Sequence, residues 1–216
     1  TVNGKKPVFF GLDAKNDFHA KNIKNSGDGK VLATLCFDNN NIDVEIPAIG
    51  TYMVTNALAA AAAGKLLGLT NEEIANGVAS YKTVGSRANV INTGKIKIID
   101  DCYNANPTSV RASLDTLSNL DGRKVAILGD MKELGSEELK LHFDTGVYAK
   151  SKDIGTVITV GELAKELAKG ADGKAFDTIE DAKSEILKTI KSGDVVLVKA
   201  SHSMQFENIV EFLKQN

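Results

Sequence analysis

The stretch DDCYNANP, residues 100–107, places two carboxylates, a thiol, a phenol and two amides in a row before a proline. A segment this polar is not buried in a core unless something polar binds to it. Asp101 could accept hydrogen bonds from ribose hydroxyls, and Tyr103, Asn104 and Asn106 offer neutral donors and acceptors. The composition of the stretch therefore predicts a site for a polar small molecule.

Two further polar clusters, GDMKELG at 129–135 and KASHSM at 199–204, also follow apolar runs typical of buried strands. The carboxyl ends of parallel strands lie at one edge of a sheet, where open α/β sheets bind ligands. Lys199 and the backbone N–H groups after it could hold an anion at a helix start. Any one cluster alone is better explained by helix capping. Three clusters at equivalent strand ends favour a binding site.

Other reactive side chains give weaker signals. The histidines lack the spacing of metal ligands, and His142 is expected to be a packed, hydrogen-bonded residue. Cys102 has no base at a recognisable spacing, so we interpret it as a small residue beside a ligand. No Gly-Lys pair belongs to a G-x-x-x-x-G-K-[ST] motif, so a phosphate cradle of that kind is absent from this sequence.

Composition narrows the class of protein. The chain has 216 residues, a net charge of -2 and 43% hydrophobic residues, enough for a substantial core. A near-neutral charge and 6% aromatic residues argue against nucleic-acid binding. Cys36 and Cys102 form no paired pattern, which fits a reducing cytoplasm, and no apolar run predicts membrane insertion. Because Thr1 is neither an initiator Met nor part of a leader, we expect a segment of a longer chain.

The first part of the chain predicts strands followed by helices. Apolar runs at 7–12, 31–37 and 42–50 are typical of strands, with SGDGK at 26–30 as a hairpin signal. The Ala-rich run that follows predicts a helix with Gly68 at its C-terminal cap. Thr70 and Glu73 form a capping box for a second helix. Residues 82–90 are small and polar, and we interpret them as a linker.

From about residue 88 apolar strands alternate with helices. Asn106 and Pro107 predict the cap and first residue of one helix, and Ser136 predicts the cap of the next. Repeated strand–helix units with apolar strands indicate an α/β fold, a mainly parallel sheet with helices on both faces.

These motifs resemble a known family. DDCYNANPTSVRASLDTL, LGDMKELG, His142 and VLVKAS are similar to the UDP-N-acetylmuramoyl-tripeptide–D-alanyl-D-alanine ligases of bacterial cell-wall synthesis. FFGLDAKNDFHAKNI and NALAAAAAGKLLGL resemble the central domain of the same family. The resemblance covers nearly the whole chain. It implies that residues 1–84 are the end of a central ATPase domain lacking its P-loop, and that residues 85–216 are a Rossmann-like C-terminal domain.

The resemblance also implies an activity. In this family ATP phosphorylates the terminal carboxylate of UDP-N-acetylmuramoyl-tripeptide, and the amine of D-alanyl-D-alanine attacks the acyl phosphate, releasing ADP and phosphate. Magnesium neutralises the phosphates, and most of its ligands would precede residue 1. The resemblance further implies a cytoplasmic monomer. The chain itself is expected to hold no complete catalytic set and to be inactive alone.

Roles carried over by position are also implied. Asn56 would contact adenine, Arg87 the phosphates or ribose, Asp101 the ribose and Tyr103 the region of the γ-phosphate. The remaining assignments are a dipeptide pocket formed by Asn104, Asn106 and the segment around Ser201, and a cleft edge formed by Asp130, Glu133 and Lys199.

The sequence departs from the family pattern at three places. Gly50-Thr51-Tyr52-Met53 stands where Gly-x-His-Asn is usual, Cys102 replaces a Ser, and Ala200 replaces a Gly. A short linker with Gly85 and Ser86 beside Arg87 would allow the C-terminal domain to close over the nucleotide and exclude water.

Two other interpretations stay open. The chain could be a non-catalytic Rossmann-like module that binds a nucleotide or a partner. It could also come from a sister ATP-dependent amide ligase that adds an amino acid to a muramoyl peptide or to folate.

Overall fold

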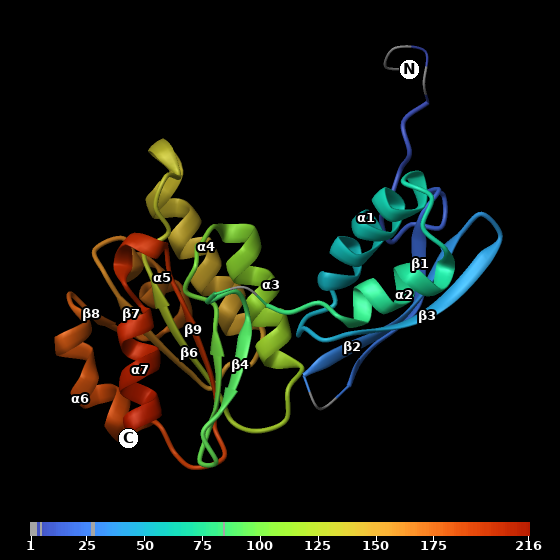
Figure 1. Ribbon diagram of the computed structural model, residues 1–216. Coiled ribbons are helices and arrows are strands. Elements are labelled where there is room, and N and C mark those ends of the chain that lie inside the picture. Colours follow the sequence, from blue (N-terminus) through green and yellow to red (C-terminus); the bar gives the residue numbers. More distant parts are fainter. Residues whose placement is uncertain (1–3, 5, 27–28, 84) are drawn as a thin grey trace. The chain divides into compact units, whose positions relative to one another are not determined.

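The computed structural model describes residues 4, 6–26, 29–83 and 85–216. The chain divides into two compact units, Thr1–Lys82 and Thr83–Asn216. Each unit has its own hydrophobic core. Figure 1 shows the helices and strands of both units.

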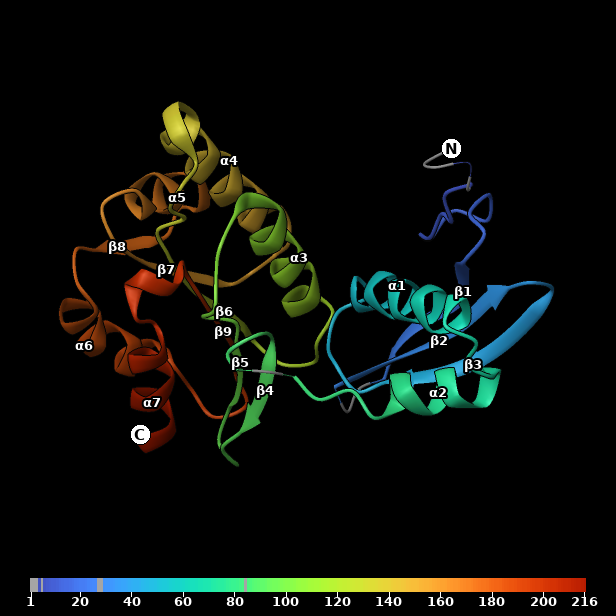
Figure 2. The same ribbon diagram turned by 45° about the horizontal axis from the view of Figure 1, so that its top comes forward.

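Unit 1 is a three-stranded antiparallel sheet covered by two helices (Figure 2). Its elements are β1 (His19–Ser26), β2 (Lys30–Phe37), β3 (Asn40–Ile46), α1 (Met53–Leu66) and α2 (Asn71–Ala79). Alternate residues of β2 such as Val31 and Leu35 are fully buried, and they share a core with Val54 and Leu58 of α1. Period-two burial of this kind is expected of a sheet with one covered face.

The predicted strands at 31–37 and 42–50 are confirmed as β2 and β3, although β3 ends at Ile46. The strand predicted at 7–12 is wrong, because only an isolated bridge joins Phe10 to Phe18. The edge position is taken instead by β1, whose largely polar sequence gave no strand signal. The hairpin predicted at 26–30 joins β1 to β2, and its residues 27–28 lie outside the described residues.

The helix boundaries of unit 1 follow from their caps. Gly68, at φ +89°, ends α1, and the amides of Gly68 and Leu69 donate to the carbonyls of Lys65 and Gly64. These two bonds define a Schellman motif. Thr70 and Glu73 form the predicted reciprocal capping box of α2. Both predicted caps are therefore confirmed.

Unit 2 is an α/β layer structure, as predicted. Its sheet has the order β4-β5-β9-β6-β7-β8, and every pairing is parallel except that of β4 with β5. The strands are β4 (Asn89–Asn92), β5 (Lys97–Asp100), β6 (Lys124–Gly129), β7 (Thr156–Val160), β8 (Lys174–Phe176) and β9 (Val195–Lys199).

Helices cover both faces of this sheet. Helices α3 (Pro107–Ser118), α4 (Glu138–Ser151) and α5 (Ala164–Ala171) lie on one side, and α6 (Ile179–Thr189) and α7 (Glu207–Gln215) on the other (Figures 1 and 2). Strand residues alternate between the two layers: Ile98 and Val196 share a core with α6 and α7, whereas their neighbours Ile99 and Leu197 are buried on the opposite face. Burial on both faces explains the continuous apolar runs of the strands.

Three features of unit 2 differ from the sequence expectation. The short edge strand β4 begins in the last two residues of the predicted linker, and the three-residue strand β8 gave no signal. Ser136 is not a helix cap, because a 3₁₀ turn, η1 (Gly135–Glu137), precedes α4, which begins at Glu138 without a side-chain cap. A second 3₁₀ turn, η2 (His202–Met204), follows β9.

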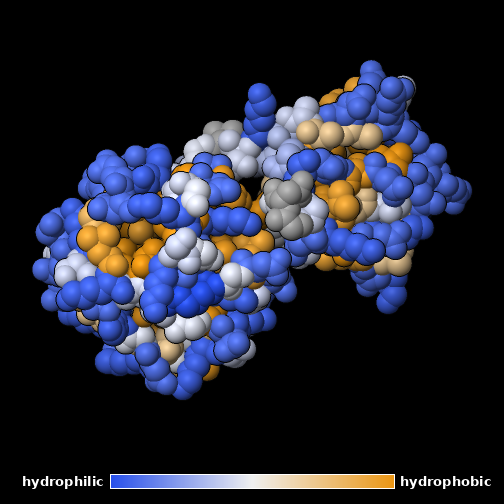
Figure 3. Space-filling view, turned by 90° about the horizontal axis from the view of Figure 1, so that it is seen from below, coloured by the Kyte–Doolittle hydropathy of each residue, from blue (hydrophilic) through white to orange (hydrophobic). Residues whose placement is uncertain are grey.

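Apolar side chains are also exposed in patches within a mostly hydrophilic surface, as seen on the face in Figure 3. In unit 1 the exposed large apolar residues include Phe9, Leu66 and Leu67. Over the described part of the chain, no helix is both long and apolar enough to cross a membrane.

Candidate functional site

The structure brings the three polar clusters to one edge of the unit 2 sheet. Strands β5, β9 and β6 are adjacent and parallel, and Asp100, Val198 and Ile127 lie in one row across them. The three clusters begin at this row or within two residues of it, at Asp100, Lys199 and Gly129. Backbone hydrogen bonds join the three clusters. The amide of Asp101 donates to the carbonyl of Val198 (3.0 Å), and the amide of Ser201 donates to the carbonyl of Asp130 (3.1 Å).

The carboxylate of Asp101 contacts three other residues at this edge. Its Oδ2 lies 2.6 Å from Nζ of Lys199 and accepts a hydrogen bond from Oγ of Ser113 (2.7 Å). Its Oδ1 accepts the amide of Ala88 at 3.0 Å. Lys199 is 2% exposed, so its ammonium lies behind the edge. The anion-binding role expected for Lys199 is therefore not what the geometry favours, because this cation is already bonded to a carboxylate.

The loop from 101 to 106 has a fixed backbone and exposes the side chains of Tyr103, Asn104 and Asn106. Nζ of Lys199 donates to the carbonyl of Asn104 (2.8 Å), and the amide of Tyr103 donates to the carbonyl of Ser86 (3.0 Å). Tyr103 is nevertheless 48% exposed, and Asn104 is exposed as well. Because the backbone of this loop is already fixed, binding a ligand orders less of the loop and loses less conformational entropy.

Asn106 is the N-terminal cap of α3, as predicted. Its Oδ1 accepts the amide of Ser109 (2.8 Å), Oγ of Ser109 accepts the amide of Asn106 (3.1 Å), and Pro107 is the first helical residue. Asn106 itself is exposed. Because the oxygen of its carboxamide serves the helix, the NH₂ group is the part of the side chain suited to a ligand.

Arg87 and Tyr103 form an exposed stack. The guanidinium carbon of Arg87 lies 3.6 Å from the centroid of the Tyr103 ring. The ring of His202 lies on the same edge, 6.1 Å from that of Tyr103 and tilted by 32°. Sequence reasoning did not single out His202 for the site, although it lies within the KASHSM cluster. A guanidinium held over an aromatic face can still use its N–H donors to meet an anion.

Cys102 points away from the exposed edge. It is 1% exposed, and its Sγ donates to the carbonyl of Val198 at 3.4 Å. Burial, and then the nearby carboxylate of Asp100, raise the pKa of the Cys102 thiol. Because a thiol must ionise to attack, Cys102 is a core residue beneath the site and is not a nucleophile.

Hydrogen bonds and an ion pair within the protein hold most of the GDMKELG cluster in place. Oδ1 of the buried Asp130 accepts the amide of Ala164, the first residue of α5, at 2.8 Å, and Oδ2 pairs with Lys132 at 2.7 Å. The amide of Lys132 donates to Oγ of the buried Ser201 (2.9 Å). Glu133 is exposed and has the left-handed φ of 64°. Of the residues assigned to the cleft edge, Glu133 is thus the one whose carboxylate faces solvent.

His142 is packed and hydrogen-bonded, as predicted. It is fully buried, its Nε2 accepts the amide of Met131 (2.9 Å), and its Nδ1 lies 2.7 Å from the carbonyl of Glu138. Because Nε2 accepts, the proton is on Nδ1, which donates to Glu138. This neutral ring ties the end of β6 to the start of α4.

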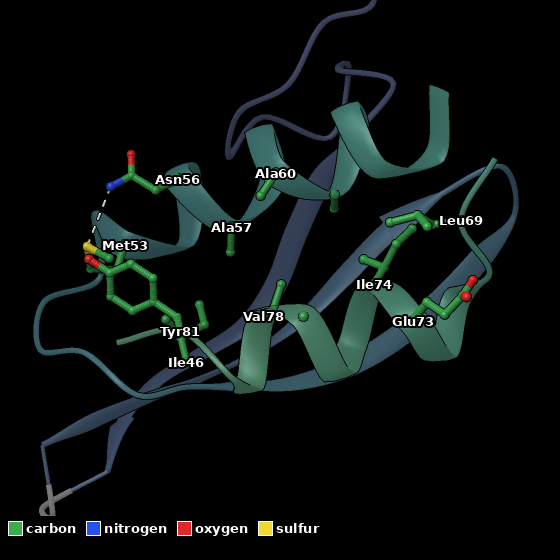
Figure 4. Close-up of a pocket in the computed structure, with 12 residues that line it drawn as sticks. Ile46, Met53, Asn56, Ala57, Ala60, Leu69, Glu73, Ile74, Val78 and Tyr81 are labelled. Carbon is green, nitrogen blue, oxygen red and sulfur yellow. Dashed lines mark hydrogen bonds between the residues drawn. The ribbon is translucent and has the colours of Figure 1, made fainter. Parts of the chain in front are cut away.

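Asn56 lies in unit 1, beside a cavity of about 290 Å³ between α1 and α2 (Figure 4). Its Nδ2 lies 3.5 Å from Sδ of Met53, and Tyr81 lies at the same end of the cavity. Most of the lining is apolar; the lining residues are Ile46, Met53, Asn56, Ala57, Ala60, Ala61, Leu69, Glu73, Ile74, Gly77, Val78 and Tyr81. Met53, which departs from the family pattern, is thus in contact with the residue assigned to adenine.

Within residues 4, 6–26, 29–83 and 85–216, no three His, Cys, Asp or Glu side chains gather where they could hold a metal ion. Because Mg²⁺ is usually held by one or two carboxylates together with substrate phosphates, roles are assigned here only to this chain's own groups.

Comparison with known families gives two matches. The family described as "Mur ligase, glutamate ligase domain" matches residues 86–202, and the "Mur ligase middle domain" matches residues 2–64. The first match covers more than half of the chain and contains the polar edge as far as His202.

Individual relatives agree with these matches. The UDP-N-acetylmuramoyl-tripeptide–D-alanyl-D-alanine ligase of Bacillus subtilis is 34% identical, over 94% of this chain and 46% of its own length. MurF from Acinetobacter baumannii superposes with a TM-score of 0.89 at 30% identity, over 96% of this chain and 46% of that one. MurF ligase from Thermotoga maritima in complex with ADP gives 0.84 at 26% identity, over 96% and 48%. The chain spans about half the length of these relatives.

Proposed function

Because the chain belongs to the Mur ligase family, we propose that it supplies the nucleotide- and dipeptide-holding part of a UDP-N-acetylmuramoyl-tripeptide–D-alanyl-D-alanine ligase. One observation carries the proposal: the Arg87–Tyr103 stack is exposed on a loop whose backbone is fixed at the carboxyl edge of a parallel sheet. The similarity to a MurF ligase solved with ADP supports it.

In this proposal four residues of this chain contribute contacts to the nucleotide. Arg87 contributes a cation for the phosphates, with Tyr103 beside it near the γ-phosphate. Asp101 retains an acceptor position on Oδ1, beside the amide of Ala88, for a ribose hydroxyl. Asn56 of unit 1 contributes an amide for the adenine ring.

The amine-binding part uses neutral groups. Asn104 and the NH₂ group of Asn106 are exposed at the same edge, close to the buried hydroxyl of Ser201. Neutral donors and acceptors suit a dipeptide whose amine must reach the reaction uncharged, because a nearby carboxylate would hold it as an ammonium. The amine attacks the carbonyl carbon of the acyl phosphate, and inorganic phosphate leaves from the tetrahedral intermediate.

This chain's residues act mainly by positioning and charge. Phosphoryl transfer depends on alignment and on stabilising the charge that develops on the transferred group. A guanidinium already stacked on Tyr103 needs little reorganisation to meet that charge. The protein would be a cytoplasmic monomer of peptidoglycan synthesis, with ATP, the UDP-linked tripeptide and D-alanyl-D-alanine as substrates.

The amine acceptor tests the proposal against a sister ligase. The natural protein that carries this chain would be assayed with ATP and UDP-muramoyl-tripeptide, and with D-alanyl-D-alanine, L-glutamate or diaminopimelate as the amine. We expect phosphate release and a ligated product, seen by mass spectrometry, only with the dipeptide. A product with one of the amino acids instead would contradict the proposal.

The isolated chain tests the proposal against a binding module. We expect residues 1–216 to show no turnover with the same substrates, because no phosphate cradle is present. Calorimetric titration should likewise give only weak ATP binding. Tight ATP binding by this chain alone would favour a self-sufficient nucleotide-binding module.

A further inference from the structure

Lys199 occupies an unusual position for a lysine. Its side chain is 3% exposed, and its ammonium contacts both the carboxylate of Asp101 (2.6 Å) and the carbonyl of Asn104 (2.8 Å). Burying a charge is costly, and a buried ion pair often stabilises a fold no better than apolar residues of similar volume. A role beyond stability is therefore worth seeking for this pair.

The bonds of Lys199 join segments that are distant in sequence. Nζ holds both ends of the turn from 101 to 104, and Asp101 in turn holds the amide of Ala88 (3.0 Å). Ala88 has φ +53°, a left-handed conformation that a residue with a Cβ adopts only when its surroundings impose it. The bond to Asp101 is part of what imposes it.

Arg87 lies between the two residues that are fixed in this way. Its neighbour Ala88 is bonded to Asp101, and its other neighbour, Ser86, accepts the amide of Tyr103 (3.0 Å). The Arg87 backbone is thereby held against the loop that carries Tyr103. The geometry of the stack depends on both attachments.

We propose that Lys199 is a positioning residue: through Asp101 and the Asn104 carbonyl it fixes residues 86–88 and 101–104 as one piece and sets the Arg87–Tyr103 stack for the nucleotide. The last part of this inference rests on the proposed function. Lys199 itself touches no substrate, because its ammonium is enclosed by the protein.

The first test observes the stack directly and needs no ligand. In NMR spectra of this chain, the side-chain protons of Arg87 should be shifted upfield by the Tyr103 ring current. Lys199→Met keeps most of the length and removes the charge, so the upfield shift should fall by at least about half. Lys199→Arg should keep most of it, because a guanidinium can still pair with Asp101. Lys150→Met, which removes a surface pair with Asp172, is the matched control and should change nothing.

The second test measures the consequence in the natural protein. Lys199→Met should raise KM for ATP by roughly tenfold, which corresponds to the loss of one charge-assisted contact. KM for the dipeptide should change less, and Lys150→Met should match wild type. A merely structural role for Lys199 would instead lower the amount of folded enzyme, and with it kcat, at unchanged KM.

The two tests separate the inference from the proposed function. An unchanged Arg87 shift in folded Lys199→Met overturns the inference, and so does a lost shift at unchanged KM for ATP. If the natural protein does not use ATP, the proposed function fails, while the NMR result still decides whether Lys199 orders the stack. If Lys199→Met does not fold, Ser113→Ala removes the neighbouring bond to Asp101 and should give a smaller loss of the same shift.

Discussion

At the residue scale, the side chains of the edge divide into those that the protein uses itself and those that it exposes. Asp101, Lys199 and Asp130 are bonded within the protein, whereas Tyr103, Asn104 and Arg87 are exposed. Sequence reasoning placed all of them except Arg87 at strand ends, because polar residues after apolar runs mark those ends. Arg87 was assigned to the linker, and its role came from the family resemblance. Sequence reasoning could not separate the two groups, because burial of Lys199 depends on Asp101, which is distant in sequence.

The buried thiol of Cys102 predicts a pH effect on stability. Its pKa is raised in the folded chain, so the unfolded chain loses the proton first as the pH rises above the ordinary value of 9.0. The buried protonated thiol therefore makes its full contribution to the free energy of unfolding below pH 9. Above pH 9 this contribution falls, by about 1.4 kcal/mol at pH 10.

Cys102→Ser removes this titration, and its hydroxyl can still donate to the carbonyl of Val198. Chemical denaturation at pH 7 and pH 10 should show the wild type losing more free energy of unfolding than the variant, by that amount. If the wild type and the variant lost equal free energy of unfolding between pH 7 and pH 10, the pKa of the thiol would not be raised by folding.

His142 gives a second prediction at this scale. His142→Leu leaves the buried amide of Met131 without its acceptor, which should lower the free energy of unfolding by about 1–3 kcal/mol. The control is His202→Leu, an exposed position that should change stability by less than about 0.5 kcal/mol. Urea denaturation measures both, and similar values for the two variants would argue against the assigned hydrogen bond.

At the element scale, strands and helices with strong local signals were predicted correctly. The caps at Gly68, Thr70 and Asn106 are examples, because each depends on residues within one turn of the helix end. The cap predicted at Ser136 failed locally, because a 3₁₀ turn precedes α4. The other errors fall where long-range contacts decide. Strand β1 is polar yet paired with β2, β4 is held only as the antiparallel neighbour of β5, and the exposed run at 7–12 lacks a full strand partner.

The contact between α4 and α5 depends on two glycines that sequence reasoning did not single out for this contact. A Cβ on Gly146 would lie 2.0 Å from the carbonyl oxygen of Leu167, and a Cβ on Gly170 would lie 2.3 Å from that of Phe143. In both cases the obstacle is backbone, which cannot rotate away.

Gly146→Ala should therefore destabilise unit 2 by about 1–3 kcal/mol, although alanine is the better helix former. Gly77→Ala in α2 is the matched control: it has nothing within 4 Å of the added Cβ, and it should stabilise unit 1 by about 0.5–1 kcal/mol. Calorimetry resolves the transitions of the two units, and a stabilising Gly146→Ala would contradict the close contact.

At the scale of the whole molecule, the α/β fold class was predictable from the alternation of apolar strands and helices, and the family from short motifs. The strand order was not predictable, because the final strand β9 inserts between β5 and β6, and nothing local encodes that insertion. This insertion places Lys199 beside Asp101, so the organisation of the proposed site is a property of the complete unit.

The most direct test of the account concerns Arg87 in the natural protein. Arg87→Met keeps a long side chain on the Tyr103 ring and removes the guanidinium, so kcat/KM for ATP should fall by at least about tenfold, while folding, followed by circular dichroism, stays unchanged. Lys150→Met should retain the wild-type value. A folded Arg87→Met protein with wild-type kcat/KM for ATP would contradict the claim that this edge receives the nucleotide.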